Sequence, residues 1–200
     1  MNSREAILQA VRHRKPAPVP LPDDAAFGKP DGDLVARFKE VVDEIGGRAI
    51  EVSLDGAASV LNALYPDRAT TASTVAHVPG NVVLEDVQDP HDLSRLDLLV
   101  CSGTLGVAEN GAVWLAESQL VHRAAPFLTQ HLAILLDRSQ IVWNMHQAYR
   151  CLRVDAEGFG VFIAGPSKTA DIEQALVIGA HGPRSLTVML VELLPRHQQT

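Results

Sequence analysis

Cysteine, positive charge and long apolar runs are scarce in this sequence, and each shortage excludes a class of protein. The chain has only two cysteines, Cys101 and Cys151, whereas an iron–sulfur cluster usually takes four thiolates. We therefore expect no cluster in this chain, and two reduced thiols rather than a disulfide, because neither cysteine lies in a CxxC pair. No apolar run approaches the ~20 residues of a membrane span. The N-terminus lacks the apolar core of a signal peptide, so we predict a cytoplasmic protein.

Acidic residues outnumber basic ones, with 24 Asp and Glu against 17 Lys and Arg and a formal net charge of −7. The only basic cluster is RHRK, at residues 12–15, and the solvated end of a helix explains it. A chain without a larger basic patch is a poor candidate for binding nucleic acid or an anionic membrane. We predict neither kind of partner.

Several motifs of catalytic and metal-binding proteins are also missing. There is no GxxxxGK[ST] phosphate loop, no GxGxxG and no GxSxG nucleophile elbow. Eight histidines are scattered along the chain without an HExxH motif or a Cys/His pair at ligand spacing, so we predict no metal site. The two tryptophans lie in apolar surroundings and are predicted to belong to the core.

The length and composition are typical of one globular domain, with 200 residues of which 46% are hydrophobic. Residues 1–14 have the pattern of a short amphipathic helix that Ser3 can cap. Residues 15–32 hold five prolines and no apolar periodicity, which predicts an extended linker. We therefore divide the chain into an N-terminal helix with a linker at 1–32 and a domain at 33–200.

Helical and apolar extended patterns alternate through the domain. Helices are predicted at residues 34–45, 55–66, 141–152 and 169–180. Strands are predicted at residues 48–54, 96–103, 131–137, 158–167 and 185–193, with a strand–turn–strand unit at 104–117 and weaker strands at 70–75 and 81–86. This order predicts an α/β fold with a mixed, largely parallel sheet flanked by helices.

The stretch GPSKTADIEQALVIGAHGP, residues 165–183, is the first candidate site. We expect a strand that ends at a glycine loop, and then a helix capped by Ser167 or Thr169 with Asp171 and Glu173 in its first turn. In open α/β sheets, ligands bind at the carboxyl ends of strands, and free N–H groups at helix N-termini hold anions. The alternative is a helix whose ends are merely turned by glycine and proline.

The second candidate is Glu109, within GTLGVAENGAVWL at residues 103–115. A carboxylate at a strand end can serve as a general base or nucleophile when burial raises its pKa. The alternative is a simple hairpin, because Asn-Gly is a strong turn signal; both can hold together. Among the histidines, His181 is the better functional candidate, because it lies in a glycine turn that keeps it accessible, whereas His131 opens a strand. Either can be structural.

Together these two stretches resemble the lactate-utilisation C proteins and their LUD domain, formerly a domain of unknown function. The likeness runs from about residue 34 to 194, although other members often have Thr where Asn110 stands here. The resemblance implies a fold like that of glucosamine-phosphate deaminase, ribose-phosphate isomerase and the CoA transferases (the NagB/RpiA/CoA-transferase-like fold). It also implies one pocket that holds a small carboxylate or phosphate, lined by Glu109, Gly165, Pro166, Ser167, Thr169, Asp171, His181 and Gly182.

The residues and the resemblance together leave three functional hypotheses open, and the resemblance implies the first. The first is a subunit of a complex that oxidises L-lactate to pyruvate. In this hypothesis the partner subunits carry iron–sulfur clusters, and this chain itself holds no cofactor. The second is a free-standing enzyme that acts on a phosphorylated sugar or a CoA ester through Glu109. The third is a binding module that senses a small carboxylate or phosphate. Fold and motif alone do not fix a reaction.

Overall fold

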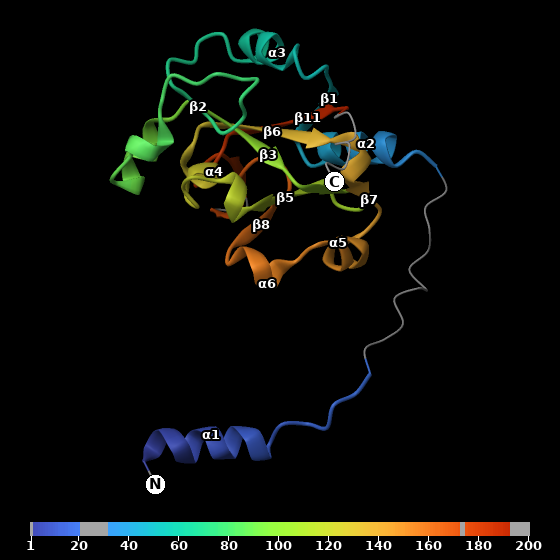
Figure 1. The fold of residues 1–200 in the computed structure, drawn as a ribbon, viewed down its shortest axis with the longest axis vertical. Helices are drawn as coiled ribbons and strands as arrows, with labels where there is room; N and C mark the ends of the chain where they lie inside the picture. The colour runs from blue at the N-terminus through green and yellow to red at the C-terminus, as the bar shows by residue number, and fades with distance from the viewer. Residues whose placement is uncertain (1, 21–31, 173–174, 193–200) are drawn as a thin grey trace, which may run out of the picture.

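The computed structural model describes residues 2–20, 32–172 and 175–192, and its centre is a parallel sheet (Figure 1). The five strands of this central sheet are parallel throughout and lie in the order β1-β11-β6-β3-β2. Their bounds are β1 Arg48–Glu51, β2 Thr71–Ser73, β3 Leu98–Gly103, β6 His131–Asp137 and β11 Ser185–Val191. The α/β fold with a mostly parallel sheet is therefore confirmed.

A second, four-stranded sheet lies against the first, in the order β7-β4-β5-β8, and β9 and β10 form a separate hairpin. Their bounds are β4 Leu105–Val107, β5 Ala112–Ala116, β7 Ile141–Val142, β8 Gly160–Ile163, β9 Lys168–Ile172 and β10 Ala175–Ile178. The predicted strand–turn–strand unit is confirmed, because β4 and β5 pair antiparallel across the Asn-Gly turn. The chain passes from β3 into β4 through Thr104 alone, which ties the two sheets together.

Helices cover both sides of the two-sheet core. Figure 1 shows α3 on one side of the central sheet, and the second sheet with α5 and α6 beyond it on the other. The helices are α1 Ser3–His13, α2 Leu34–Glu44, α3 Ala57–Leu64, α4 Ala125–Leu128, α5 Met145–Cys151 and α6 Val154–Glu157. Short 3₁₀ turns are η2 Leu84–Asp86, η3 Pro90–Arg95, η4 Glu117–Gln119 and η5 Arg138–Gln140. Among the described helices, none is long and apolar enough to cross a bilayer.

The central strands are apolar on both faces because both faces are covered. Leu99 and Ile134 belong to the cluster that packs on α2 and the second sheet. Leu98 and Ala133, the neighbouring positions on the same strands, belong to the cluster that packs on α3. Side chains alternate between the two faces of a strand, so each strand contributes to both clusters. This double burial explains the nearly continuous apolar runs in the sequence.

The predicted helix at 34–45 is confirmed as α2. The Asp33 carboxylate accepts a hydrogen bond from the Val35 N–H at 2.8 Å and caps the helix. Phe38, Val41 and Val42 are buried on one face, and the chain leaves the helix through Gly46, whose φ is +81°. The N-cap and the apolar face that the sequence predicts for this helix are therefore both present in the structure.

The two cysteines lie in opposite environments, as two free thiols. Cys101 is fully buried in β3, and burial raises the pKa of its thiol to about 12, whereas Cys151 is exposed at the end of α5. We expect a disulfide-exchange reagent at mild alkaline pH to modify only Cys151 in the folded chain, and both thiols after unfolding, because the thiolate is the reactive form. A Cys151→Ala variant should show almost no reaction when folded. A fast reaction of that variant would contradict the burial of Cys101.

Three predicted elements differ from the structure. Residues 169–180 are not a helix but most of the β9–β10 hairpin, so Ser167 and Thr169 do not cap a helix. Residues 81–86 form a 3₁₀ turn after an isolated bridge, not a strand. The stretch 141–152 begins with the short strand β7, and only its second half is helical, as α5. The Glu173 position in the expected helix lies outside the described residues.

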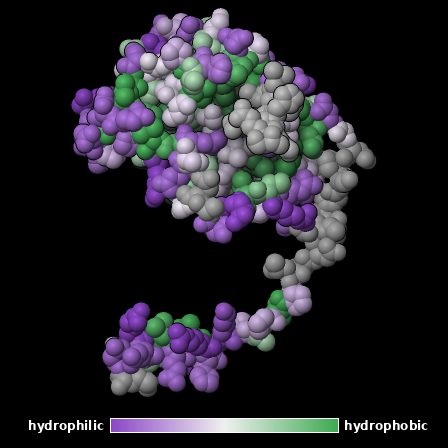
Figure 2. Space-filling model, viewed as in Figure 1, coloured by the Kyte–Doolittle hydropathy of each residue, from purple (hydrophilic) through white to green (hydrophobic). Residues whose placement is uncertain are grey.

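The predicted N-terminal helix is confirmed as α1, but its cap is Asn2 rather than Ser3. The Asn2 side chain accepts a hydrogen bond from the Glu5 N–H at 3.0 Å. No residue of α1 is buried. Ile7, Leu8 and Val11 are exposed, and apolar residues show on the surface of this helix in Figure 2. Since residues 21–31 lie outside the described part of the chain, the division at residue 32 stays a prediction.

Candidate functional site

The two stretches singled out in the sequence meet at the C-terminal end of α2. A Cβ added to Gly111, in the β4–β5 turn, would lie 3.0 Å from Ile45 Cδ1. A Cβ added to Gly165 would lie 2.9 Å from the Ile45 carbonyl oxygen. Both glycines have positive φ, +68° and +73°. The expectation that the regions of Glu109 and Gly165 lie near each other is consistent with this geometry, although the pocket itself stays a prediction.

Ser167 closes the 165–183 stretch into a loop. Its N–H donates to the Pro183 carbonyl at 2.9 Å, and its own carbonyl accepts from the Gly179 N–H at 2.9 Å. A Cβ added to Gly182 would lie 3.0 Å from Ser167 Cβ. The beginning and the end of the stretch are therefore held side by side. The close approach explains why small residues stand at both positions.

The other predicted ligand-binding residues are distributed around this loop. Pro166 is buried and Thr169 is half-buried. His181 is exposed and lines, with Gly182, a small cavity of about 360 Å³. The backbone of Asp171 lies in β9, and its side chain lies outside the described part of the structure. The strand before the loop, β8, belongs to the second sheet and is half-buried, so the loop does not follow a buried strand of the parallel sheet as expected.

Glu109 lies in the turn between β4 and β5 and reaches α5. Its Oε2 accepts a hydrogen bond from the Met145 N–H at 3.1 Å, which supplies a partner for the first turn of that helix. The residue is exposed. No hydrogen bond joins Glu109 to residues 165–169 or 179–183 among the residues that the structure describes. A structural role for the carboxylate is therefore visible, and a catalytic role stays a prediction.

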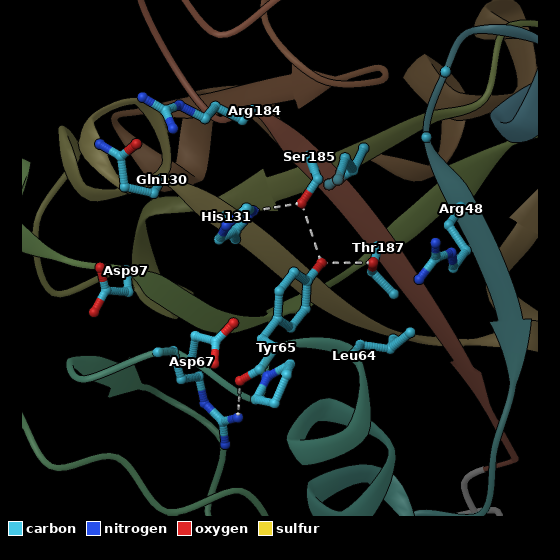
Figure 3. Close-up of a pocket in the computed structure, with 15 residues that line it drawn as sticks. Arg48, Leu64, Tyr65, Asp67, Asp97, Gln130, His131, Arg184, Ser185 and Thr187 are labelled. Atoms are coloured by element: carbon cyan, nitrogen blue, oxygen red, sulfur yellow. Dashed lines mark hydrogen bonds between the residues drawn. The ribbon is translucent and has the colours of Figure 1, made fainter.

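A polar cavity that borders the end of the 165–183 stretch lies at the amino ends of the parallel strands (Figure 3), and we call it the amino-edge cavity. It has a volume of about 640 Å³ and is bordered by the first residues of β1, β6 and β11 and by the residues that follow α3. Arg184, which directly follows the 165–183 stretch, is one of the residues that line the cavity. The sequence had indicated the opposite edge, because ligands in α/β sheets usually bind at the carboxyl ends of strands. A second polar cavity, of about 700 Å³, does lie there, beside Ser73 of β2 and Ser102 of β3.

A hydrogen-bonded group of four side chains forms the floor of the amino-edge cavity (Figure 3). His131 Nδ1 lies 2.8 Å from Ser185 Oγ. The Tyr65 hydroxyl lies 3.2 Å from Ser185 Oγ and 2.8 Å from Thr187 Oγ1. Strand register brings this group together, because His131 of β6 pairs with Ser185 of β11, and Tyr65 directly follows α3. The Tyr65 and His131 rings also pack together, with centroids 4.8 Å apart.

Two charged residues of the cavity form hydrogen bonds within the protein. Asp97 accepts hydrogen bonds from the Ala69 and Thr70 N–H groups at 2.8 Å, and these bonds lower the pKa of its carboxyl. Arg68 donates to the Tyr65 carbonyl at 2.7 Å and to the Thr71 hydroxyl at 3.1 Å. Both residues therefore hold the wall of the cavity together.

His131 is the titratable group at the centre of the cavity. Partial burial lowers the pKa of its imidazole, the nearby Arg184 charge lowers it further, and Asp97 partly opposes the change. The imidazole is therefore neutral at neutral pH, with one ring nitrogen as donor and the other as acceptor. A neutral His131 can exchange hydrogen bonds with the hydroxyl of a ligand.

The lowered pKa of His131 makes stability depend on pH. As the pH falls below about 6.5, the unfolded chain binds a proton at His131 before the folded chain does. The contribution of neutral His131 to the free energy of unfolding is therefore complete above that pH, and it is lost as the pH falls through the pKa of the folded state. Asp97 stabilises the folded chain above its ordinary pKa of 3.8, and this stability is lost only as the pH falls below about that value. We expect the urea midpoint to fall more between about pH 7 and about pH 5 in the wild type than in His131→Gln. Parallel pH profiles would contradict the assignment.

Sequence reasoning missed this cavity, although two signals for it were present. His131 was noted only as a residue that opens a strand. Ser185 and Thr187 stand two positions apart at the start of an otherwise apolar strand, which places both hydroxyls on one face. Tyr65 and Arg68 follow a helix, and the sequence around them has no comparable spacing of polar residues that would indicate a site.

The parallel sheet, with helices on its faces, defines an α/β protein. The family model of the LUD domain matches residues 26–191. The chain therefore belongs to the LUD domain family, and the resemblance seen in the sequence is confirmed.

Relatives with this domain carry a common name. The chain is similar to "Lactate utilization protein C" of Geobacillus thermodenitrificans, 29% identical over 167 residues, which are 80% of this chain and 69% of that protein. It is also similar to the protein of the same name from Bacillus pumilus, 36% identical over 92 residues, or 43% of this chain. That second match spans 38% of the length of the Bacillus pumilus protein.

A solved structure has the same fold. It is a crystal structure of a DUF162 family protein from Deinococcus radiodurans, with a TM-score of 0.62 and 17% identity. The match covers 79% of this chain and 96% of that one. The likeness extends through the domain and supports the arrangement of the two sheets.

Proposed function

We propose that this chain is a small-anion-binding subunit of a complex that oxidises L-lactate to pyruvate. The observation that supports this proposal is the match over most of the domain to proteins named lactate utilization protein C. The oxidation removes two electrons and two protons from lactate, and the electrons need an acceptor. We propose that iron–sulfur clusters in partner subunits accept them, because this chain has only two cysteines, one of them buried.

Copurification from the native host tests this proposal. The full-length chain with an affinity tag is expected to retain partner proteins that contain iron and acid-labile sulfide. The eluted complex is expected to reduce a dye when L-lactate is added, and the chain purified alone is not. A tagged chain that is recovered without iron-containing partners, or that oxidises lactate alone, would contradict the proposal.

The anion is proposed to lie at the 165–183 loop, where Ser167 and Gly182 are held together. The narrower fold resemblance, to the NagB/RpiA/CoA-transferase-like proteins, stays a prediction. Asp171 and His181 stay predicted ligands at this loop.

A free-standing enzyme that uses Glu109 is the second candidate. In its favour, Glu109 is exposed and only its Oε2 has a hydrogen-bond partner among the described residues. Its Oε1 is therefore open to a substrate in the part of the structure that is described. The same Oε2 contact means that an alanine variant also removes a helix contact.

Glu109→Gln separates the two roles, because glutamine keeps an oxygen for the Met145 N–H. If the carboxylate is catalytic, we expect turnover to fall by about 100-fold or more, with a melting temperature within about 2 °C of the wild type. The substrates to test are sugar phosphates and CoA esters with the chain alone, and L-lactate with the complex. Unchanged turnover in every assay would restrict Glu109 to its contact with α5.

A further inference from the structure

The amino-edge cavity has two arginines that form no ion pair with a carboxylate among the described residues. Arg48 and Arg184 border it, and both are exposed without an ion pair in the part of the chain that is described. Other arginines of the domain are paired with carboxylates: Arg37, Arg95, Arg123, Arg138 and Arg153. Arg48 and Arg184 are therefore available for an external anion, which a guanidinium can bind with two parallel hydrogen bonds.

Hydroxyl groups lie between the two arginines, as Figure 3 shows. Tyr65 and Ser185 bring hydroxyls that both donate and accept hydrogen bonds. The Nε2 atom of His131 has no hydrogen-bond partner among the described residues, whereas Nδ1 faces Ser185. Asp67 lies on the opposite wall, where its carboxylate can accept from a ligand hydroxyl. This mixture is suited to a ligand that carries several hydroxyl groups.

The size of the cavity indicates a ligand larger than lactate. Its volume of about 640 Å³ lies within the range of roughly 300–1,000 Å³ that is usual for small-molecule sites. A three-carbon acid has the bulk of a few water molecules, on the order of 100–150 Å³ at about 30 Å³ each. Arg48 pairs in register with Thr187, three residues after Arg184, so the two arginines stand roughly 10 Å apart along the strands.

We propose that the amino-edge cavity binds an anionic small molecule with several hydroxyl groups, its phosphate or carboxylate on Arg184 or Arg48 and its hydroxyls on Tyr65, Ser185 and His131. A sugar phosphate and a sugar acid share this chemistry. The site does not rest on the lactate-oxidising role, because its residues lie outside the predicted 165–183 and Glu109 motifs. The cavity nevertheless adjoins the first of these motifs, since Arg184 is the residue directly after the 165–183 loop.

Calorimetric titration of the full-length chain tests the site, with four probes in parallel. Ribose 5-phosphate and D-gluconate are the two large probes, and inorganic phosphate and L-lactate are the two small ones. We expect one large probe to bind at least tenfold more tightly than the small probe with the same charged group. Preference for ribose 5-phosphate assigns a phosphate ligand, and preference for gluconate assigns a carboxylate ligand. Equal binding of large and small probes would overturn the role of the hydroxyls.

Matched variants locate the binding. Arg184→Gln and Arg48→Gln are each expected to weaken binding of the preferred large probe, at least one of them by tenfold or more. Ser185→Ala is expected to weaken the large probe and not the small one. The control is Arg95→Gln, which removes an exposed arginine that pairs with Asp92 outside the cavity. Circular dichroism and melting curves verify that the variants fold. Wild-type affinity in both cavity arginine variants, or no binding of either large probe, would overturn the proposal.

Discussion

Replacing Gly165 by alanine should lower the free energy of unfolding by about 2–4 kcal/mol, since two costs add. The residue has φ +73°, and an alanine there loses about 1–2 kcal/mol in left-handed conformation. The added Cβ would also lie 2.9 Å from the Ile45 carbonyl oxygen. That atom belongs to the backbone at the end of α2, so it cannot move aside without disturbing the helix. Urea unfolding monitored by circular dichroism measures the loss.

Gly46→Ala is the matched control for this prediction. Its φ is +81°, and the atoms nearest to an added Cβ belong to the Lys168 side chain at 3.7 Å, which is ordinary van der Waals contact. The control should therefore show only the conformational cost, about 1–2 kcal/mol. Equal losses in the two variants would mean that the contact between the 165–183 loop and α2 is not tight. That contact is what brings the two sequence motifs to the same end of α2.

Replacing Gly160 by alanine should cost a similar amount, about 3 kcal/mol, through overpacking alone. Gly160 of β8 pairs with Ala116 of β5, and an added Cβ would overlap the ring of Trp114. Trp114 is only 5% exposed and packs on Phe162, with ring centroids 4.7 Å apart, so the ring has little room to move. Thermal and urea unfolding of the variant measure the loss.

A double variant tests whether the Trp114 ring is the cause. Trp114→Leu removes the overlapped atoms, and in that background Gly160→Ala should cost less than about 1 kcal/mol. The expected coupling energy is about 2 kcal/mol, in the range found for residues in contact. Additive effects would show that the glycine is needed for another reason, such as the conformation of the strand.

The strands of the core could be predicted from the sequence because burial on two faces leaves a direct trace. Runs such as residues 96–103 and 131–137 are apolar without alternation, and they became β3 and β6. The helix α2 was equally readable, since Asp33 caps it and its apolar residues recur at helical spacing. In these elements, local propensity and tertiary packing favour the same structure.

The β9–β10 hairpin could not be predicted in this way. Residues 169–180 contain helix-favouring Ala, Glu, Gln and Leu, yet Thr169 pairs with Val177 across the hairpin. The pairing is fixed by contacts distant in sequence, from Ser167 to Gly179 and Pro183, and such contacts override a weak helical preference. β-Branched residues at 169, 172, 177 and 178 were the signal available for a strand.

The candidate site was only partly readable for a related reason. Glycines at 111 and 165 could be recognised as special, but the residue they approach, Ile45, lies far from both in sequence. The amino-edge cavity draws on the beginnings of β1, β6 and β11 and on the end of α3. No single stretch contains that combination, so only strand order brings it together.

The position of β11 in the central sheet has a consequence for synthesis on the ribosome. β1 pairs with β11, and Arg48 lies opposite Thr187, so in the described sheet this early strand finds its neighbour only when almost the whole domain has been made. β6 likewise exposes one edge until β11 fills the space between it and β1. Contacts so distant in sequence slow folding and leave apolar strand edges open meanwhile. A nascent chain that stops before residue 185 therefore presents two unpaired edges, which are the surfaces that a chaperone or an aggregating neighbour would bind.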